Sequence, residues 1–225
     1  MTTASSSPES APESGRGSVF TGIMAVVAIV ASVAGLITIL GSAASAAPQI
    51  GQLAPDFSAQ DSKGDALRLS QYRGKTVVLE WTNADCPYTR KHYTSGNMQS
   101  VQELAQQKGI VWLTVISSAP GKQGYVNGPA ADALTESRHA APTAVLLDPS
   151  GTVGHLYSAK TTPHMFVIDK NGTLQYMGGI DSIATADIAH AEPYLKEAML
   201  AVAQGEKPPH SVTKPYGCAV KYAGS

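Results

Sequence analysis

Three apolar runs of strand length stand out along the chain. Residues 77–81 (VVLEW), 110–117 (IVWLTVIS) and 165–169 (MFVID) are rich in β-branched and aromatic side chains. Near-continuous hydrophobicity of this kind is typical of strands that are buried on both faces in a sheet flanked by helices. We therefore expect these three segments to form the centre of a sheet.

Shorter segments and turns complete the predicted sheet. Residues 61–64 (DSKG) have the composition of a hairpin turn. Residues 144–148 predict a short strand, and the tight turn at 170–172 (KNG) predicts a hairpin that returns through residues 173–177. The sheet would thus contain hairpins as well as strands linked by crossovers.

Helical segments separate these strands. Residues 87–108 contain few helix breakers, and Gly109 is a favourable residue just beyond a helix end. Residues 187–203 have apolar side chains at helical spacing in spite of Pro193. Two shorter helices are predicted at residues 129–139 and 151–159. The alternation of strands and helices predicts an α/β fold with a mixed central sheet flanked by helices.

Composition narrows the possible functions. The 225 residues carry a net charge of −1, and only 15% of them are charged. A nucleic-acid-binding surface requires clustered Lys and Arg, so we expect no nucleic-acid partner. With 43% apolar residues the chain can bury a large core, and its length fits one domain plus a tail or a targeting segment.

The N-terminal part of the chain differs from the rest. Residues 1–18 are rich in Ser, Pro and Glu, which is typical of a disordered leader. Residues 19–40 are uncharged and apolar, and about 20 such residues suffice to cross a bilayer as a helix. Small residues follow at 41–47, where 44–46 (ASA) fits a signal-peptidase site. We therefore predict a signal peptide or a transmembrane anchor over residues 19–47.

Both alternatives predict export across the membrane. The protein would be periplasmic or otherwise extracytoplasmic, either soluble or anchored by a single span, with membrane contact only through residues 19–40 if they are not removed. The cysteine content agrees with export, because an oxidising compartment permits one bridge between the two cysteines, Cys86 and Cys218.

Cys86 has the features of a reactive thiol. A strand leads towards it through residues 83–85, which include favourable N-cap residues, and Pro87 suits the first position of a helix. The helix dipole and the free N–H groups at a helix start favour a thiolate. Arg90 and Lys91 either add positive charge nearby or form a solvated helix face, which is the commoner role of such pairs. We predict a nucleophilic cysteine. The alternative is a small, buried and unreactive side chain.

Residues 205–225 form a tail that carries the second cysteine. The prolines at 208–209 prevent continuation of the last helix, so the tail is expected to run over the surface or to hang free. A turn at 215–217 (PYG) presents Cys218. Cys218 is therefore either a resolving cysteine for Cys86 or its partner in a permanent structural disulfide.

Three separated segments resemble known redox proteins. Residues 51–64 (GQLAPDFSAQDSKG) and 67–81 (LRLSQYRGKTVVLEW) resemble the opening segment and the next two strands of peroxiredoxins. Residues 161–172 (TTPHMFVIDKNG) resemble the thioredoxin-superfamily segment that carries a cis-proline. The chain thus resembles thioredoxin-superfamily redoxins of the peroxiredoxin-like branch (alkyl hydroperoxide reductase/thiol-specific antioxidant type). The resemblance implies a thioredoxin-like fold for a redoxin domain at residues 48–204.

The resemblance also implies roles for individual residues. Pro163 would form a cis peptide bond beside Cys86, where Thr162 would offer its backbone to a substrate strand. Our own hypothesis adds that Tyr88 and Thr89 line the site, with Thr89 donating a hydrogen bond to the thiolate; packing and helix solvation are equally compatible roles for these two residues. The expected catalytic residues are Cys86, Cys218, Thr89 and Pro163, and the expected substrate-binding residues are Tyr88, Thr162 and Trp81.

The chain departs from the related families at one position. In thioredoxins a second cysteine lies three residues after the first, and in typical peroxiredoxins the peroxide-reacting cysteine corresponds to that second position. Here Thr89 occupies it, and Cys86 takes the first position. The partner of Cys86 would therefore come from elsewhere, and the tail segment 214–222 (KPYGCAVKY) resembles the endings of peroxiredoxin-like redoxins with the same CPY pattern.

Three functions are compatible with these features. We predict an exported thiol-disulfide oxidoreductase in which Cys86 attacks and Cys218 resolves, without a cofactor or a metal. Its partners would be a protein or small-molecule thiol or disulfide and an external thiol reductant. One alternative is an antioxidant thiol peroxidase of peroxiredoxin type. Another is a non-catalytic thioredoxin-fold or metal-binding module with a structural disulfide, in which Cys86, His92 and His164 are the candidate ligands.

Overall fold

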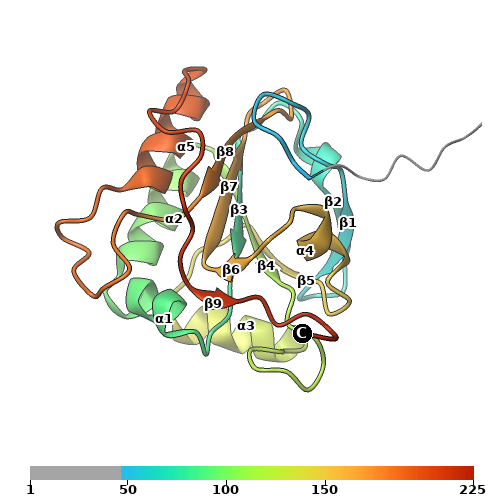
Figure 1. The fold of residues 1–225 in the computed structure, drawn as a ribbon. Coiled ribbons are helices and arrows are strands. Elements are labelled where there is room, and N and C mark those ends of the chain that lie inside the picture. The colour runs from blue at the N-terminus through green and yellow to red at the C-terminus, as the bar shows by residue number, and fades with distance from the viewer. Residues whose placement is uncertain (1–46) are drawn as a thin grey trace, which may run out of the picture. The chain divides into compact units, whose positions relative to one another are not determined.

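A seven-stranded mixed sheet forms the centre of the computed structural model, which describes residues 47–225 (Figure 1). Its strands are β1 (Ser58–Asp61), β2 (Ala66–Arg68), β3 (Val77–Trp81), β4 (Val111–Ile116), β5 (Ala144–Leu147), β7 (His164–Ile168) and β8 (Leu174–Gly178). They are arranged in the order β2-β1-β5-β4-β3-β7-β8. Strands β3, β4 and β5 are parallel, and the other pairings are antiparallel.

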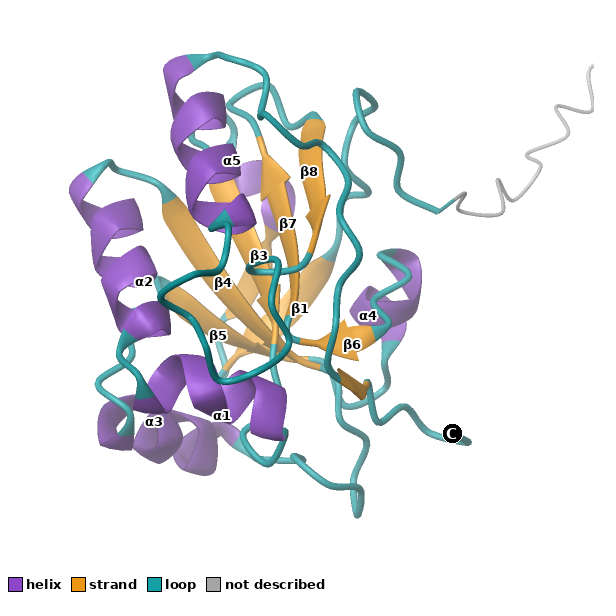
Figure 2. Ribbon diagram, turned by 60° about the vertical axis from the view of Figure 1, so that its left-hand side comes forward, coloured by secondary structure: helices purple, strands orange, loops and turns teal. Residues whose placement is uncertain are grey.

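Helices cover both faces of this sheet (Figure 2). They are α1 (Pro87–Thr94), α2 (Asn97–Gln107), α3 (Gly128–Ser137), α4 (Thr152–Leu156) and α5 (Tyr194–Gln204), with a short 3-10 helix at Leu69–Tyr72. On one face, α2 and α5 contribute Met98 and Leu195 to the core. On the other face, Val153 of α4 and the adjacent Tyr157 pack against the sheet. The predicted mixed sheet flanked by helices is therefore confirmed.

The predicted strands are present, but two helices have different limits. The helix expected at 87–108 is interrupted at Gly96, whose φ of 77° is a left-handed conformation that costs glycine little. The helix expected at 187–203 begins only at Tyr194. Pro193 is its N-cap, because a proline inside the helix would remove a backbone hydrogen bond and clash with the preceding turn. The two shorter predicted helices are confirmed as α3 and α4.

Glu80 places a carboxyl group inside the protein, on the central strand β3, and its side chain is fully buried. Trp112 Nε1 and Thr114 Oγ1 donate hydrogen bonds to its Oε2 at 2.9 and 3.1 Å. The Tyr93 hydroxyl donates to Oε1 at 3.0 Å, and Gln102 Nε2 lies 3.4 Å from Oε2. Burial of a carboxyl group is costly unless it is hydrogen-bonded, and these donors offset that cost.

The predicted leader at 1–18 and the predicted signal peptide or anchor at 19–47 lie outside the described residues, apart from Ala47. Within residues 47–225, no helix combines the length and the hydrophobicity that crossing a bilayer requires. The described residues correspond to the predicted redoxin domain and the tail.

Leu195 offers a test of how α5 is held against the sheet, because its side chain is fully buried. Leu195→Ala would leave a cavity and is expected to lower the free energy of unfolding by about 2–5 kcal/mol in chemical denaturation. The exposed neighbour Lys196 provides a matched control, since Lys196→Ala should change stability by only about 0.5 kcal/mol. Equal effects of the two substitutions would contradict the packing described for α5.

Candidate active site

Cys86 lies where β3 leads into α1. It is the N-cap of α1, and Pro87 occupies the first helical turn as predicted. The cap is thus Cys86 itself and not one of residues 83–85, because the Asn83 side chain accepts a hydrogen bond from a nearby backbone N–H before the helix begins. The Cys86 side chain is fully buried, and its thiol donates a hydrogen bond to the Thr162 carbonyl at 3.0 Å.

The loop with the predicted cis-proline faces this thiol. The peptide bond between Thr162 and Pro163 is cis, as the resemblance implies. The residues before it form β6 (Thr161–Thr162), which pairs in antiparallel fashion with β9 (Cys218–Ala219) in a separate two-stranded sheet (Figure 1). Thr162 is the register partner of Cys218. The backbone that was expected to receive a substrate strand therefore holds the protein's own tail.

The tail is docked on the domain and does not hang free (Figure 1). Upstream of β9, Thr213 Oγ1 lies 2.7 Å from the Tyr176 hydroxyl. Downstream of β9, Val220 is buried in the core on the α4 side of the sheet. Tyr222 stacks on His155 of α4 with 4.0 Å between the ring centroids. Contacts on both sides therefore hold β9 in place.

Docking of the tail brings the two cysteines together, although they lie 132 positions apart in the chain. The Cys218 backbone N–H donates a hydrogen bond to Cys86 Sγ at 3.4 Å. The side chain of Cys218 is also hydrogen-bonded to Cys86. Both thiols are free, Cys86 buried and Cys218 partly exposed. The structure thus shows a reduced pair of neighbouring thiols.

The two thiols differ in their electrostatic surroundings. Burial raises the pKa of Cys86, but hydrogen bonds from the Cys218 thiol, the Thr89 backbone N–H and the Thr162 side chain outweigh it, and the pKa lies below that of an ordinary cysteine. Burial, together with the adjacent Cys86 sulfur, raises the pKa of Cys218 to about 11. Cys86 therefore ionises first, and the thiolate is the nucleophilic form.

Thr89 and Tyr88 lie on α1 beside the thiol. The Thr89 backbone N–H is hydrogen-bonded to Cys86. Its hydroxyl is buried and has no hydrogen-bond partner among the described residues, so the predicted bond from this side chain is not formed. Tyr88 is 37% exposed, and its ring centroid lies 5.9 Å from that of Tyr216 in the tail. The catalytic and substrate-binding roles of Thr89 and Tyr88 stay predictions.

Trp81 lies in the core, away from the surface. Its side chain is fully buried and packs against Tyr157 and Phe166, with ring centroids 5.4 and 5.2 Å away. Its Nε1 donates a hydrogen bond to Ser117 Oγ at 3.0 Å. Because other side chains enclose the indole on β3, the structure gives Trp81 no surface on which a substrate could lie.

His92 and His164 have hydrogen-bond partners of their own. Asn97 Nδ2 lies 2.9 Å from His92 Nδ1, and the Tyr216 hydroxyl lies 3.0 Å from His92 Nε2. His164 Nδ1 accepts a hydrogen bond from the Lys160 backbone N–H at 3.3 Å. In the part of the chain that the structure describes, no three His, Cys, Asp or Glu side chains gather in a way that could hold a metal ion.

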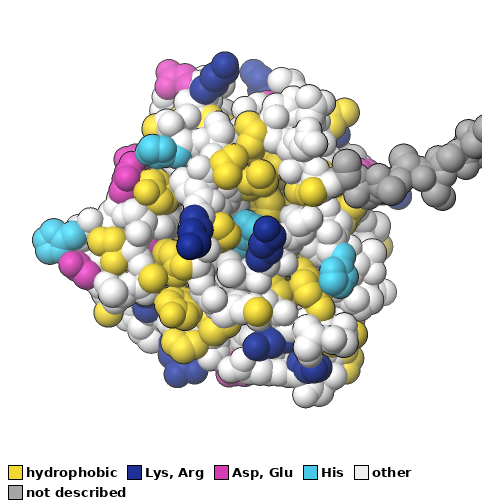
Figure 3. Space-filling model, in the orientation of Figure 1, with side chains coloured by type: hydrophobic (Ala, Val, Ile, Leu, Met, Phe, Trp, Pro, Cys, Tyr) yellow, Lys and Arg dark blue, Asp and Glu magenta, His cyan; other side chains and the backbone are white. Residues whose placement is uncertain are grey.

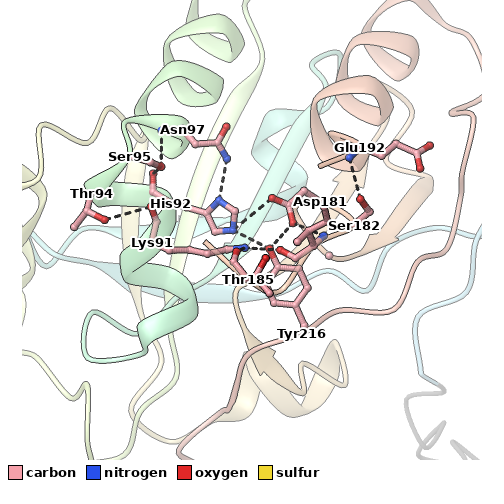
Figure 4. Close-up of polar contacts among 12 residues, drawn as sticks. Lys91, His92, Thr94, Ser95, Asn97, Asp181, Ser182, Thr185, Glu192 and Tyr216 are labelled. Carbon is pink, nitrogen blue, oxygen red and sulfur yellow. Dashed lines mark hydrogen bonds and ion pairs between the residues drawn. The ribbon is translucent and has the colours of Figure 1, made fainter. Parts of the chain in front are cut away.

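A partly buried polar cluster around Tyr216, which lies two residues before Cys218, was not evident from the sequence (Figure 4). The Tyr216 hydroxyl donates a hydrogen bond to Asp181 and contacts His92. Lys91, which was expected to add charge beside the thiol, instead donates hydrogen bonds to the carbonyls of a loop after β8 and lies 4.7 Å from the centre of the Tyr216 ring. The nearness of Tyr216 to Cys218 was visible in the sequence, but no local pattern links it to Asp181.

Comparison with known proteins identifies the family. The AhpC/TSA family matches this sequence over residues 50–177. The chain belongs to the AhpC/TSA family. It is also similar to the thiol-disulfide oxidoreductase ResA of Geobacillus kaustophilus (strain HTA426), with 30% identity over 133 residues, which are 56% of this chain and 67% of the relative. The ResA protein of Geobacillus thermodenitrificans (strain NG80-2) is 29% identical over the same shares of the two chains.

Solved structures agree on the fold. A hypothetical protein of Sinorhizobium meliloti 1021 has a TM-score of 0.70 at 19% identity, over 79% of this chain and 96% of its own. An uncharacterized conserved protein of Geobacillus kaustophilus also has a TM-score of 0.70, at 20% identity, over 79% of this chain and 94% of its own. Together with the family match, this confirms a thioredoxin-superfamily redoxin with a thioredoxin-like fold.

The different surroundings of the two thiols predict different pH dependences of alkylation. The rate for Cys86 should rise through a midpoint below that of free cysteine, because its pKa is lowered, whereas the rate for Cys218 should still be rising above pH 9 since its pKa is about 11. Iodoacetamide labelling of the reduced protein, followed by peptide mapping, measures both sites in one sample. A lower midpoint for Cys218 than for Cys86 would reverse the assignment of the nucleophile.

Proposed function

We propose that this redoxin is an exported thiol-disulfide oxidoreductase with Cys86 as nucleophile and Cys218 as resolving cysteine. The observation that carries the proposal is the pairing of Cys218 with Thr162, which sets the Cys218 N–H 3.4 Å from Cys86 Sγ in the reduced protein. The lowered pKa of Cys86 and the raised pKa of Cys218 support this division of roles. The similarity to two thiol-disulfide oxidoreductases supports the reaction class.

The proposed reaction has two steps. The Cys86 thiolate attacks one sulfur of a substrate disulfide, the substrate S–S bond breaks, and the leaving thiolate takes a proton from solvent. Cys218 then loses its proton and attacks the Cys86 sulfur, which releases the second substrate thiolate and forms a Cys86–Cys218 disulfide. The substrate gains two electrons and the protein loses two. An external thiol reductant returns the protein to its dithiol form.

A substrate strand and the tail compete for one backbone edge. Cys86 is fully buried, and β9 occupies the backbone of Thr162, so β9 has to leave before a protein substrate reaches the thiol. In the proposed complex an extended substrate segment takes the place of β9 and forms backbone hydrogen bonds next to Pro163. Tyr88, at the exposed side of α1, would contact that segment.

The surface beside the tail suits substrates with apolar groups. A cavity of about 240 Å³ lies there, between the tail and the start of β7. Its polar members include Lys160 and His164, and its apolar members include Phe166, Met177 and Val212. Figure 3 shows the face of the molecule across which the tail runs, and on it hydrophobic side chains lie next to basic side chains and His. We expect this face to accept apolar residues that flank a substrate disulfide.

We also propose that residues 19–47 direct export. The support is the uncharged apolar stretch at 19–40 and the small residues that follow it. Export would place the two cysteines in a compartment where an internal disulfide persists until a reductant opens it. Both a removed signal peptide and a retained single-span anchor are compatible with this proposal.

A thiol peroxidase is the second candidate function, because the family match is to AhpC/TSA proteins. In that reaction the Cys86 thiolate attacks a peroxide, the O–O bond breaks, and Cys86 becomes a sulfenic acid while water or an alcohol leaves. Cys218 would then attack the sulfenic sulfur, release water and form the same internal disulfide. The two candidate functions share both cysteines and differ in the oxidant.

The resolving role is tested by Cys218→Ser. With a disulfide substrate this variant should accumulate a mixed disulfide on Cys86, because no second thiol is present to release the substrate, and mass spectrometry of the unreduced protein measures the adduct. Cys86→Ser is the control and should form far less adduct. Normal turnover by the Cys218 variant would show that Cys218 does not resolve.

The oxidant is tested by comparing peroxide with a disulfide. We expect hydrogen peroxide to oxidise Cys86 no faster than an ordinary thiolate, because Thr89 fills the position of the peroxide-reacting cysteine of typical peroxiredoxins. The second-order rate constant is measured by mass spectrometry after rapid mixing, with free cysteine at the same thiolate fraction as reference. A rate constant far above that reference would favour the peroxidase.

A further inference from the structure

Tyr216 ties the tail to the domain two residues before Cys218 (Figure 4). Its hydroxyl donates a hydrogen bond to Asp181 Oδ1, in the loop after β8. His92 Nε2, from α1, lies 3.0 Å from the same hydroxyl oxygen. Asp181 is 4% exposed and His92 is fully buried, whereas Tyr216 is partly buried, so the domain side of this contact is shielded from water. The Tyr216 hydroxyl therefore connects the tail to two separate elements.

The hydrogen bonds of this cluster run in one direction. Asn97 Nδ2 donates to His92 Nδ1 at 2.9 Å, so the proton of the neutral imidazole is on Nε2 and points to the Tyr216 oxygen. Burial and the Lys91 ammonium lower the pKa of His92 to about 3, which keeps the ring neutral. The Tyr216 hydroxyl in turn donates a hydrogen bond to Asp181 Oδ1. Removing this hydroxyl would take away the acceptor of His92 and one donor to Asp181.

Only Gly217 separates Tyr216 from Cys218, and it lies tightly against β6. Its φ is 144°, and a Cβ at this position would lie 2.1 Å from the Thr162 carbonyl oxygen. The chain between Tyr216 and Cys218 therefore has little room to adjust. When Tyr216 is held by its two partners, Cys218 is held next to Cys86.

We propose that Tyr216 is a positioning residue that docks the tail, so that Cys218 is presented to Cys86 and Cys86 is shielded from solvent. The role in resolution rests on the proposed function, whereas the shielding does not. Loss of the hydroxyl should loosen the docked tail. Attack by Cys86 on an external disulfide should then become faster, and resolution by Cys218 slower. These opposite changes are the signature of the proposal.

The attack step is measured in the full chain with Cys218→Ser, so that Cys86 is the only thiol. The probe is dithiodipyridine, whose released thiopyridone is followed by absorbance at a pH where Cys86 is fully ionised in each variant. Adding Tyr216→Phe should speed the attack up to about tenfold, the factor that corresponds to about 1.4 kcal/mol for one intramolecular hydrogen bond. Adding Gly217→Ala, which clashes with Thr162, should speed it at least as much.

The resolution step is measured in the chain that retains both cysteines. After Cys86 has reacted with dithiodipyridine, attack by Cys218 releases a second thiopyridone, and this phase should be about tenfold slower in Tyr216→Phe. Tyr125→Phe is the matched control, because Tyr125 is exposed and lies outside the tail. Leu195→Ala controls for a general loss of stability and should not produce a faster attack together with a slower resolution.

The outcomes separate this proposal from the proposed function. If Tyr216→Phe reacts like the parent chain while Gly217→Ala reacts faster, the tail shields Cys86 without help from the hydroxyl and the role of Tyr216 is refuted. If neither variant is faster, the docked tail does not shield Cys86 and the proposal fails. If the attack is faster but the parent chain releases no second thiopyridone, Tyr216 still docks the tail and the resolving role of Cys218 is what fails.

Discussion

The pairing of β9 with β6 is the contact on which the site depends. It aligns Cys218 with Thr162 and so brings a cysteine from the end of the chain to the start of α1. Two strands of two residues each form too small a sheet to be stable alone. The contacts of Thr213 on one side and of Val220 and Tyr222 on the other therefore have to supply the stability.

In the proposed reaction, this arrangement links access of the substrate to Cys86 with the resolution step by Cys218. In a helix-borne cysteine pair, the second thiol can stay in place while the substrate binds. Here Thr89 occupies that second position, and the strand that carries Cys218 also covers Cys86. In the reaction that we propose, the two thiols meet when the tail is docked, and a protein substrate binds the backbone of Thr162 after the tail has left. Movement of the tail is thus part of the reaction that we propose.

Hydrogen bonds, and not charged side chains, lower the pKa of Cys86. Burial opposes ionisation of both thiols, but hydrogen bonds from the Cys218 thiol and from the N–H groups of Thr89 and Cys218 stabilise the Cys86 thiolate. Lys91 was expected to help, yet its ammonium group is hydrogen-bonded to carbonyls on the loop after β8. The position of Cys86 at a helix start therefore contributes through directed hydrogen bonds, as the local sequence indicated.

Local patterns in the sequence determined the central strands and the helix start at Cys86 and Pro87, because each depends on residues close together in the chain. The cis bond at Pro163 was implied by the family resemblance and not by a local pattern. The sequence did not predict the interruption at Gly96 or the late start of α5, because helix propensity carries no information on where the chain must turn in order to pack.

Only the tertiary structure decided what the tail does. The sequence presented Cys218 in a turn and left open whether the tail was docked. Trp81, which was expected to bind substrate, is enclosed by the sheet and its neighbours. The partners of Tyr216 come from α1 and from the loop after β8. Such contacts join segments that are distant in sequence, and packing of the whole domain, which no local pattern records, brings them together.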